Sequence, residues 1–264
     1  MTSRTEKLRA RLYRQPPGIC LERGRIYTES WKETEGEPLV IRRALGLARV
    51  LREMTIYIGD GELLVGNHAS RPLAVPLFPE FSAFWFKDEM DTVASRPQDA
   101  FILRDEDRET FAELEDYWRG KTHYDRMMGN IVHMLPPDVA DAFDRDGLHV
   151  NQVYHAVIST TDGDGHVALD FPQILSLGFE GLAQKAQRVK ESLDPTVAEN
   201  VRKRIFLESV VISCNAAADF GRRYAKLARQ LAEDCPDALR RQELIEIAAI
   251  CDRVPAGPAG TFRE

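Results

Sequence analysis

A helical pattern of unusual length occupies the last quarter of this 264-residue chain. Asp194 and Pro195, a capping residue followed by a proline suited to a first helical turn, come directly before it. Side chains of one face then recur at helical spacing over about seven turns, at Ile205, Ser209, Ile212, Ala216, Phe220, Tyr224, Leu227 and Leu231. Together with the shorter helical patterns elsewhere, this face predicts a mainly α fold with a few short strands.

The other predicted helices lie on both sides of a less regular middle. Up to about residue 54 the pattern is helical, with one apolar face after Pro38 made of Ile41, Ala44, Leu45, Ala48 and Leu51. Helices are expected around 81–92 and 105–118, and Gly120 is a plausible stop for the second. A helix resumes after Pro172, and a last one is expected over 236–251.

Three segments read as non-helical. The run Thr55–Gly66 has two short apolar stretches around Gly59-Asp60-Gly61, which predicts a hairpin-like pair of extended segments. The prolines at 72, 76 and 79 favour irregular structure. The segment 121–170 is expected to be mostly loop with short extended pieces. No repeat and no clear linker divides the chain, so 1–264 is interpreted as one unit.

Composition excludes several classes of protein. The formal net charge of −7 and the isoelectric point near 5.5 argue against nucleic-acid binding. The N-terminus lacks a signal-peptide core, and no run approaches the ~18 apolar residues of a membrane span, so we expect a cytoplasmic protein with no membrane partner. The four cysteines are widely spaced without a C-x-x-C pair, which predicts reduced thiols and no zinc site.

The histidine-rich segment invites a metal hypothesis. Five of the six histidines lie within 121–170, at His123, His133, His149, His155 and His166. None has the H-x-x-x-H or H-E-x-x-H spacing that places two ligands on one helical face, so we predict no metal site. Asp162-Gly163-Asp164-Gly165 resembles the start of a calcium loop but lacks the closing acidic residue and is interpreted as a tight turn. Nucleotide and serine-nucleophile motifs are absent.

Several blocks of the sequence together resemble the glycyl radical enzymes of the pyruvate formate-lyase and diol dehydratase kind. The first block is Thr28–Leu45, T-E-S-W-K-E-T-E-G-E-P-L-V-I-R-R-A-L. The others follow in order at Gly61–Asn67, Phe78–Phe81, Asp116–Thr122, Gly165–Phe171, Ser209–Cys214, Arg223–Lys226 and Glu243–Cys251. The resemblance covers essentially the whole chain and looks closest to the glycerol dehydratase group.

The resemblance implies the helical N-terminal portion of a truncated ten-stranded α/β barrel, since such enzymes are roughly three times this length. In the family, a cysteine and a glutamate on a loop inside the barrel carry the chemistry. A glycine near the C-terminus stores the radical, which an iron–sulfur, S-adenosylmethionine-dependent activase installs. No counterpart of these elements is present in 1–264. Cys20-Leu21-Glu22 has the family's Cys-x-Glu form but matches its N-terminal helix, so Cys20 is interpreted as a buried thiol and no catalytic residue is expected.

Two positions are implied as substrate-binding. His166, in Gly165-His166-Val167, matches a family histidine that binds a substrate hydroxyl group, and an imidazole can donate to or accept from such a group. Ile158 stands eight residues earlier, at a pocket position where polar or aromatic residues are usual. This aliphatic residue departs from the family pattern and puts glycerol itself in doubt as the substrate.

The functional expectation is the N-terminal fragment of a radical lyase or dehydratase that eliminates water or another group from a small hydroxylated substrate. The chain alone is expected to be inactive and to bind no cofactor, whereas the full-length enzyme would be a homodimer that engages its activase through the missing C-terminal region. Alternatives are a formate C-acetyltransferase-type member, a non-catalytic helical accessory or binding module, and a metal-dependent hydrolase built on the histidines.

Overall fold

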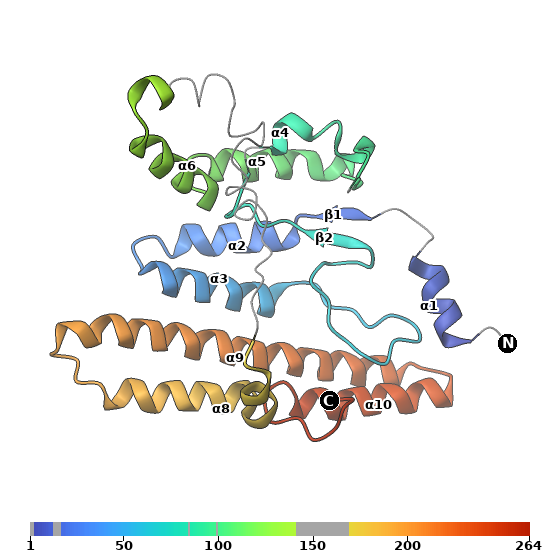
Figure 1. Ribbon diagram of the computed structural model, residues 1–264. Coiled ribbons are helices and arrows are strands. Elements are labelled where there is room, and N and C mark those ends of the chain that lie inside the picture. Colours follow the sequence, from blue (N-terminus) through green and yellow to red (C-terminus); the bar gives the residue numbers. More distant parts are fainter. Residues whose placement is uncertain (1–2, 13–16, 84, 99, 141–168) are drawn as a thin grey trace. The chain divides into compact units, whose positions relative to one another are not determined.

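The computed structural model describes residues 3–12, 17–83, 85–98, 100–140 and 169–264, which belong to two compact units (Figure 1). The first unit comprises residues 1–16, 26–75 and 169–264, and the second comprises 17–25 and 76–168. Both units are mainly helical, and the described residues contain two three-residue strands. The prediction of a mainly α chain with a few short strands is confirmed.

Four helices make the core of the first unit. The long helix α9 (Ala198–Glu233) packs against α3 (Leu39–Glu53), α8 (Phe171–Ser192) and α10 (Ala238–Arg253). Figure 1 shows α8 and α10 one after the other along one side of α9, with α3 on another side. Because three helices contact α9, small side chains such as Ala216, Ala225 and Ala228 are fully buried on it. Small residues allow helix axes to approach closely.

The signature block Thr28–Leu45 joins α2 (Glu22–Glu33) to α3 and is held by ring contacts. The Arg42 guanidinium lies 3.9 Å from the centre of the Trp31 ring and donates a hydrogen bond to the Trp31 carbonyl. Trp31 in turn stacks on Tyr27 with ring centres 5.7 Å apart. A Cβ on Gly46 would lie 2.5 Å from the Tyr27 ring, so this position of α3 requires glycine. Arg42 and Trp31 of this block therefore hold α2 and α3 together.

Helix boundaries differ from the sequence expectation at one cap. The predicted Asp194 cap is wrong, because α9 begins at Ala198 and Val197 precedes it without a side-chain cap. Asp194 instead accepts hydrogen bonds from the Thr196 N–H (2.9 Å) and hydroxyl (2.7 Å), which closes a turn before the helix. The helices predicted after Pro172 and over 236–251 are confirmed as α8 and α10.

The predicted hairpin over 55–66 is wrong. The segment turns at Gly59, whose carbonyl accepts from the Glu62 N–H (3.2 Å), but its two apolar stretches form no strand pair. Ile56, Ile58 and Val65 pack against the cluster of α9 and α10 that contains Tyr224 and Ile247. Burial against helices, rather than pairing with each other, satisfies these side chains.

The second unit contains short elements around an aromatic core. Strand β1 (Gly18–Cys20) lies in this unit and forms a two-stranded sheet with β2 (Ala74–Pro76), of which Pro76 belongs to this unit. The Leu77 N–H then donates to the Cys20 carbonyl (3.3 Å). The helical elements are α4 (Phe86–Glu89), η1 (Val93–Ser95), η2 (Asp105–Asp107), α5 (Arg108–Trp118) and α6 (His123–Met134). Phe86 stacks on Phe111 at 4.4 Å between ring centres, and both side chains are buried.

One helix prediction and one loop prediction in this unit need correction. The expected helix over 81–92 shrinks to α4, whereas the one over 105–118 is confirmed by η2 and α5. The segment 121–170 is wrong as a continuous loop, because α6 begins at His123. Thr122 and Asp125 form a capping box there, in which each side chain accepts from the other residue's N–H (3.0 and 3.1 Å).

Candidate functional site

The two predicted substrate-binding residues, His166 and Ile158, lie outside the described residues. The same sequence block, Gly165–Phe171, continues into described structure at Leu169, and helix α8 begins at Phe171. The described residues that follow this block in the sequence are the first two turns of α8, and the contacts of those turns are described next.

The start of α8 is fixed by its own cap. Asp170 accepts hydrogen bonds from the Gln173 N–H (3.1 Å) and from the Gln173 side-chain amide (2.9 Å). Pro172 stands in the first turn, where its missing N–H costs no helical hydrogen bond. The carboxylate also compensates the positive end of the helix. Asp170 of the G-H-V-A-L-D-F block thus has a structural role as a helix cap.

Helix α8 is interrupted at Gly178, and the C-terminal tail, residues 255–264, accepts the hydrogen bonds of the N–H groups that this interruption frees. Gly178 has φ 66° and ψ 174°, a conformation essentially restricted to glycine. The N–H groups of Phe179 and Glu180 donate to the carbonyls of Pro255 and Ala256, both at 2.9 Å. A break in a helix frees backbone groups that need other partners, and the tail supplies them.

A cavity of about 450 Å³ lies between the start of α8, the inner turns of α9 and α10, and this tail. We call it the tail cavity and define it by six of its lining residues: Leu64, Phe171, Leu175, Tyr224, Cys251 and Pro255. The tail closes one wall, because the Ala259 N–H donates to the Leu175 carbonyl (3.0 Å). The volume falls within the range of about 300 to 1,000 Å³ that is usual for pockets that bind small molecules.

A polar side chain of the tail cavity, Tyr224, is engaged in a hydrogen bond within the protein. The buried Tyr224 hydroxyl donates to the Asn67 side-chain carbonyl. The Asn67 amide donates to the carbonyls of Thr55 (2.9 Å) and Ala69 (2.6 Å), which fixes the chain after Gly66. Burial raises the pKa of the Tyr224 hydroxyl well above its ordinary value, so the group stays protonated at neutral pH.

The pKa of the cavity's thiol is raised for the same reason. Burial, and to a smaller extent the charge of Asp252, raises the pKa of the Cys251 thiol. Thiolates are the nucleophilic form of cysteine, and a raised pKa depletes that form. The described wall of the cavity can therefore bind apolar groups, but it offers no activated nucleophile.

Arg223, the neighbour of Tyr224 in the R-Y-A-K block, ties α9 to the end of α3. Its guanidinium donates to the carbonyls of Leu51 (2.5 Å) and Met54 (2.6 Å). These carbonyls lie in the last turn of α3 and at its C-cap, where a cation is favoured by the helix dipole. Arg223 thus holds the end of α3, before Thr55, and its neighbour Tyr224 holds Asn67, after Thr55.

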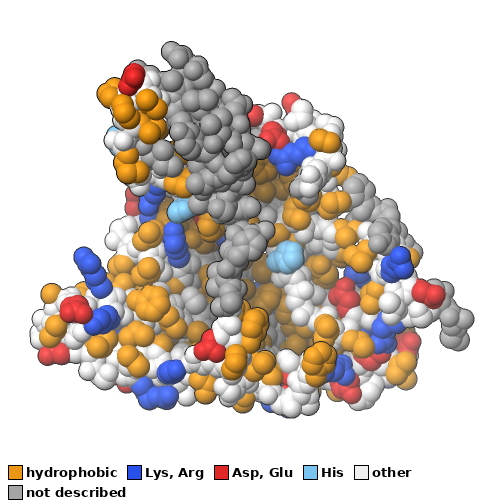
Figure 2. Space-filling view, in the orientation of Figure 1, with side chains coloured by type: hydrophobic (Ala, Val, Ile, Leu, Met, Phe, Trp, Pro, Cys, Tyr) orange, Lys and Arg blue, Asp and Glu red, His pale blue; other side chains and the backbone are white. Residues whose placement is uncertain are grey.

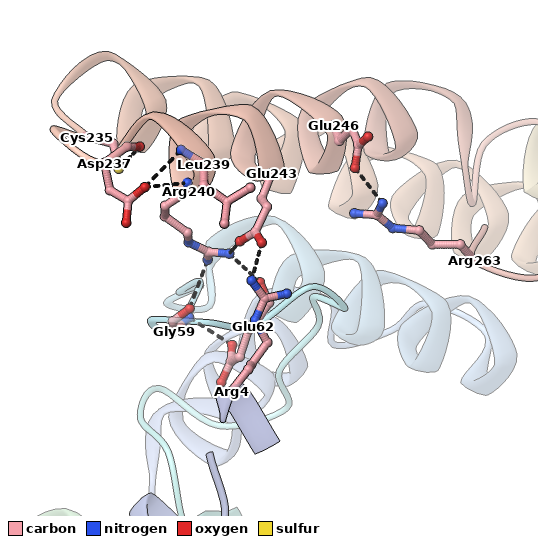
Figure 3. A network of polar contacts seen from close by, with 10 residues as sticks. All are labelled: Arg4, Gly59, Glu62, Cys235, Asp237, Leu239, Arg240, Glu243, Glu246 and Arg263. Atoms are coloured by element: carbon pink, nitrogen blue, oxygen red, sulfur yellow. Dashed lines mark hydrogen bonds and ion pairs between the residues drawn. The ribbon is translucent and has the colours of Figure 1, made fainter. Parts of the chain in front are cut away.

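A polar network fixes the N-terminal helix α1 (Arg4–Leu12) to α10 (Figure 3). Glu243 accepts from Arg4 and from Arg240 (3.0 Å), and Arg240 also donates to the carbonyls of Gly59 (3.1 Å) and Glu62 (2.8 Å). Burial alone would raise the pKa of Glu243, but its hydrogen bonds with the two arginines outweigh that effect and lower it. The network is a structural clamp.

In the second unit, Cys20 is buried within β1, which confirms its interpretation as a buried thiol. Beside it in the sequence, Arg23 forms a two-pronged ion pair with Glu80 (2.6 and 3.0 Å) and lies 3.8 Å from the centre of the Phe78 ring. This contact accounts for the F-P-E-F block. Among the described residues, no three His, Cys, Asp or Glu side chains are grouped as metal ligands would be.

Sequence reasoning missed Gly178 and the paired roles of Asn67 and Tyr224. Gly178 interrupts the apolar pattern after Pro172, and an isolated glycine inside a helical pattern is the available signal of a break. Asn67 and Tyr224 lie in two of the quoted blocks, 157 residues apart, and no local pattern connects them.

Comparisons with known proteins agree over the whole chain. A sequence model described as Pyruvate formate lyase-like matches residues 1–264. A probable dehydratase, YbiW of Escherichia coli (strain K12), is 33% identical over 93% of this chain and 29% of its own length. The isethionate sulfite-lyase of Oleidesulfovibrio alaskensis is 34% identical over 94% of this chain and 30% of its own length.

A solved structure shares the fold. The glycerol-bound form of the B12-independent glycerol dehydratase from Clostridium butyricum superposes with a TM-score of 0.89 and 35% identity, over 100% of this chain and 32% of that chain. The chain thus spans about a third of the length of the relatives it matches. In the described part, no helix has the length and apolar character needed to cross a bilayer.

Proposed function

We propose a function on the premise that the chain belongs to the pyruvate formate lyase-like family of glycyl radical enzymes and corresponds to their N-terminal portion. It serves as the helical N-terminal part of a cytoplasmic lyase or dehydratase that removes water or another group from a small hydroxylated substrate. The observation that carries this proposal is the match of the entire chain, at 35% identity, to a dehydratase whose structure holds glycerol.

The radical chemistry itself belongs to the remainder of a full-length protein. The sequence contains no glycine-radical motif of the R-V-x-G-Y kind and no G-C-x-E loop. Cys20, Cys214 and Cys251 are buried, and burial raises the pKa of the Cys214 and Cys251 thiols. No radical step is therefore assigned to these residues, and the 264-residue chain alone should be inactive. A full-length homodimer would contain the ten-stranded barrel, the radical glycine and the contact with the activase.

Within the full-length enzyme, His166 binds a hydroxyl group of the substrate and Ile158 occupies a second position of the substrate pocket. An imidazole can hold a hydroxyl group that is about to leave as water, because it donates or accepts a hydrogen bond. Support comes from the sequence block that contains His166, since it continues without a gap into the cap and first turn of α8, where Phe171 lines the tail cavity.

The test is a chimera in which this chain replaces the aligned 32% of the Clostridium butyricum enzyme. After activation, we expect turnover of a small diol. Replacing His166 with Ala should lower kcat/KM by about 10- to 100-fold, which corresponds to a lost substrate hydrogen bond of roughly 1.5 to 3 kcal/mol.

The matched control is His68→Ala, because His68 is an exposed histidine of the described part. It should leave kcat/KM unchanged, and both variants should carry as much glycyl radical as the parent chimera. An unchanged kcat/KM in His166→Ala would refute the substrate-binding role. Equal losses in both variants would refute it as well, because the effect would not be specific to the site.

A further inference from the structure

A second cavity, of about 610 Å³, lies in the first unit between α1, the turn over 59–62 and the first turns of α10. We call it the N-terminal cavity and define it by six of its lining residues: Lys7, Leu8, Asp60, Leu239, Arg240 and Glu243. Figure 2 shows acidic and basic side chains intermixed on the surface over α1 and the adjoining end of α10. The volume is within the range of about 300 to 1,000 Å³ that is usual for sites of small molecules.

The charges that line the N-terminal cavity balance one another. Its ionisable lining comprises four basic side chains and four acidic ones, at Arg4, Lys7, Arg11 and Arg240 and at Glu6, Asp60, Asp237 and Glu243. A cavity lined by one sign of charge concentrates ions of the opposite sign, but a balanced lining favours neither anions nor cations overall. A ligand matched to this lining therefore carries both signs of charge or none.

The three arginines of the lining are held in ion pairs within the protein. Arg4 and Arg240 both pair with Glu243, and Figure 3 shows the three side chains together. Arg11 pairs with Glu62 on the turn (2.8 Å). These pairs fix the guanidinium groups against the body of the first unit, so the arginines shape the wall of the cavity.

Two lining charges of opposite sign remain available to a ligand. Glu6 accepts from the Ser3 N–H (2.7 Å), and Asp237 caps the start of α10. The side chains of Lys7 and Asp60, in contrast, are exposed and have no ion-pair or hydrogen-bond partner among the described residues. A ligand that engages both must present a carboxylate to the Lys7 ammonium and an ammonium to the Asp60 carboxylate.

Apolar side chains of the same cavity indicate what else the ligand carries. Leu8 lies half-buried on α1, and Leu239 is 69% exposed in the first turn of α10. Covering such side chains removes apolar surface from water and is favourable. An α-amino acid with an aliphatic side chain combines this apolar group with the two charges that Lys7 and Asp60 require.

We propose that the N-terminal cavity binds a zwitterionic α-amino acid with an aliphatic side chain. Lys7 donates to the carboxylate of the ligand, Asp60 accepts from its ammonium group, and its side chain contacts Leu8 and Leu239. Because Lys7 lies on α1 and Asp60 on the turn over 59–62, the bound amino acid joins these two segments. The proposal does not depend on the proposed function, since none of these residues is assigned to it.

The experiment is isothermal titration calorimetry of the 264-residue chain with L-leucine and two analogues that each lack one charge. Isoamylamine keeps the ammonium group, and isocaproate keeps the carboxylate. We expect L-leucine to bind and each analogue to bind at least about tenfold more weakly, because each loses one charge-assisted hydrogen bond. If the chain alone does not fold, the same titrations on the chimera with the Clostridium butyricum enzyme decide. No binding of L-leucine, or binding of either analogue as tight as that of L-leucine, would overturn the proposal.

Two substitutions test which side chain holds which charge of the ligand. In Lys7→Gln, L-leucine should bind no more tightly than isoamylamine, because its carboxylate has lost its partner. In Asp60→Asn, it should bind no more tightly than isocaproate. The matched control is Arg9→Gln, since Arg9 is an exposed residue of α1 that does not line the cavity, and all three affinities should stay within a factor of about two. An undiminished preference for L-leucine in either cavity variant, or an equal loss in Arg9→Gln, would overturn the proposal.

Limited proteolysis supplies a second readout. Because the bound amino acid joins α1 to the turn, a saturating concentration of L-leucine should slow tryptic cleavage within α1 several-fold in the wild type and leave it unchanged in Asp60→Asn. Equal rates with and without L-leucine in the wild type would overturn the assignment of the ligand to this cavity.

Discussion

Replacing Gly178 with Ala should destabilise the first unit more than any ordinary surface substitution. An alanine at φ 66° and ψ 174° carries a conformational cost of about 1 to 3 kcal/mol. Its Cβ would also stand 2.3 Å from the Ala256 carbonyl oxygen and 2.4 Å from the Gly257 carbonyl carbon, both backbone atoms that cannot rotate away. The tail must therefore move, which weakens the two hydrogen bonds from Phe179 and Glu180 at a cost of about 0.5 to 1.5 kcal/mol each.

Together these effects predict a loss of roughly 2 to 6 kcal/mol in the free energy of unfolding. The assay is urea denaturation followed by circular dichroism at a helix-sensitive wavelength. The matched control is Gly129→Ala in α6, where a Cβ meets nothing within 4 Å and where we expect a gain of about 0.5 to 1 kcal/mol. A loss below about 1 kcal/mol at Gly178 would refute the argument that the tail contact requires glycine there.

Three further substitutions test the contacts around the tail cavity and the N-terminal clamp. Tyr224→Phe removes the hydroxyl that donates to Asn67 and should lower the free energy of unfolding by about 1 to 2 kcal/mol in urea denaturation. The pKa of the Tyr224 hydroxyl is higher in the folded state than the unfolded value near 10. Wild-type stability should therefore fall above pH ~10, and the variant should lose less stability there. No difference between the two alkaline profiles would contradict this. Arg223→Ala leaves the carbonyls at the end of α3 without their cation and should lower the unfolding free energy by roughly 2 to 4 kcal/mol, and a change below 1 kcal/mol would contradict the cap. Glu243→Gln should speed tryptic cleavage within α1 several-fold, whereas the control Glu246→Gln should not. Because the pKa of Glu243 is lowered in the folded state, the protection of α1 in the wild type is present above pH ~4.5 and is lost at lower pH. Equal cleavage of the wild type and both variants would disprove the clamp.

The long helices were predictable from sequence because their periodicity runs over many turns. The face from Ile205 to Leu231 lies within α9, and the helix expected over 236–251 matches α10 to within two residues at each end. The error at Asp194 arose because an aspartate before proline can close a turn as well as cap a helix, and the two uses look alike in sequence.

Short elements were not predictable for the opposite reason. Strands β1 and β2 have three residues each, too few for any period to show, and their pairing depends on contacts distant in sequence. The hairpin error over 55–66 followed from treating the two apolar stretches around Gly59-Asp60-Gly61 as paired with each other, whereas Ile56, Ile58 and Val65 pack on α9 and α10. Helix α6 did carry a local signal, the Thr122 and Asp125 capping box, but the many histidines and prolines nearby favoured a loop interpretation.

For the candidate site, too, local sequence blocks were recognisable, whereas contacts between distant segments were not predictable. The block with His166 and the block with Arg223 and Tyr224 were recognisable as strings that resemble a family. What Tyr224 does, however, depends on Asn67 from the other end of the chain, and the tail cavity exists only because residues 255–259 reach the broken turn of α8. Such placement follows from the packed fold and cannot be obtained from a local pattern.

The central claim, that this chain is the N-terminal scaffold of a glycyl radical enzyme, is tested most directly by electron paramagnetic resonance on the chimera after anaerobic treatment with the activase and S-adenosylmethionine. The account predicts a glycyl radical signal in the chimera and none in the 264-residue chain treated in the same way. A radical signal in the 264-residue chain, or a folded chimera without a signal under conditions that activate the parent Clostridium butyricum enzyme, would contradict it.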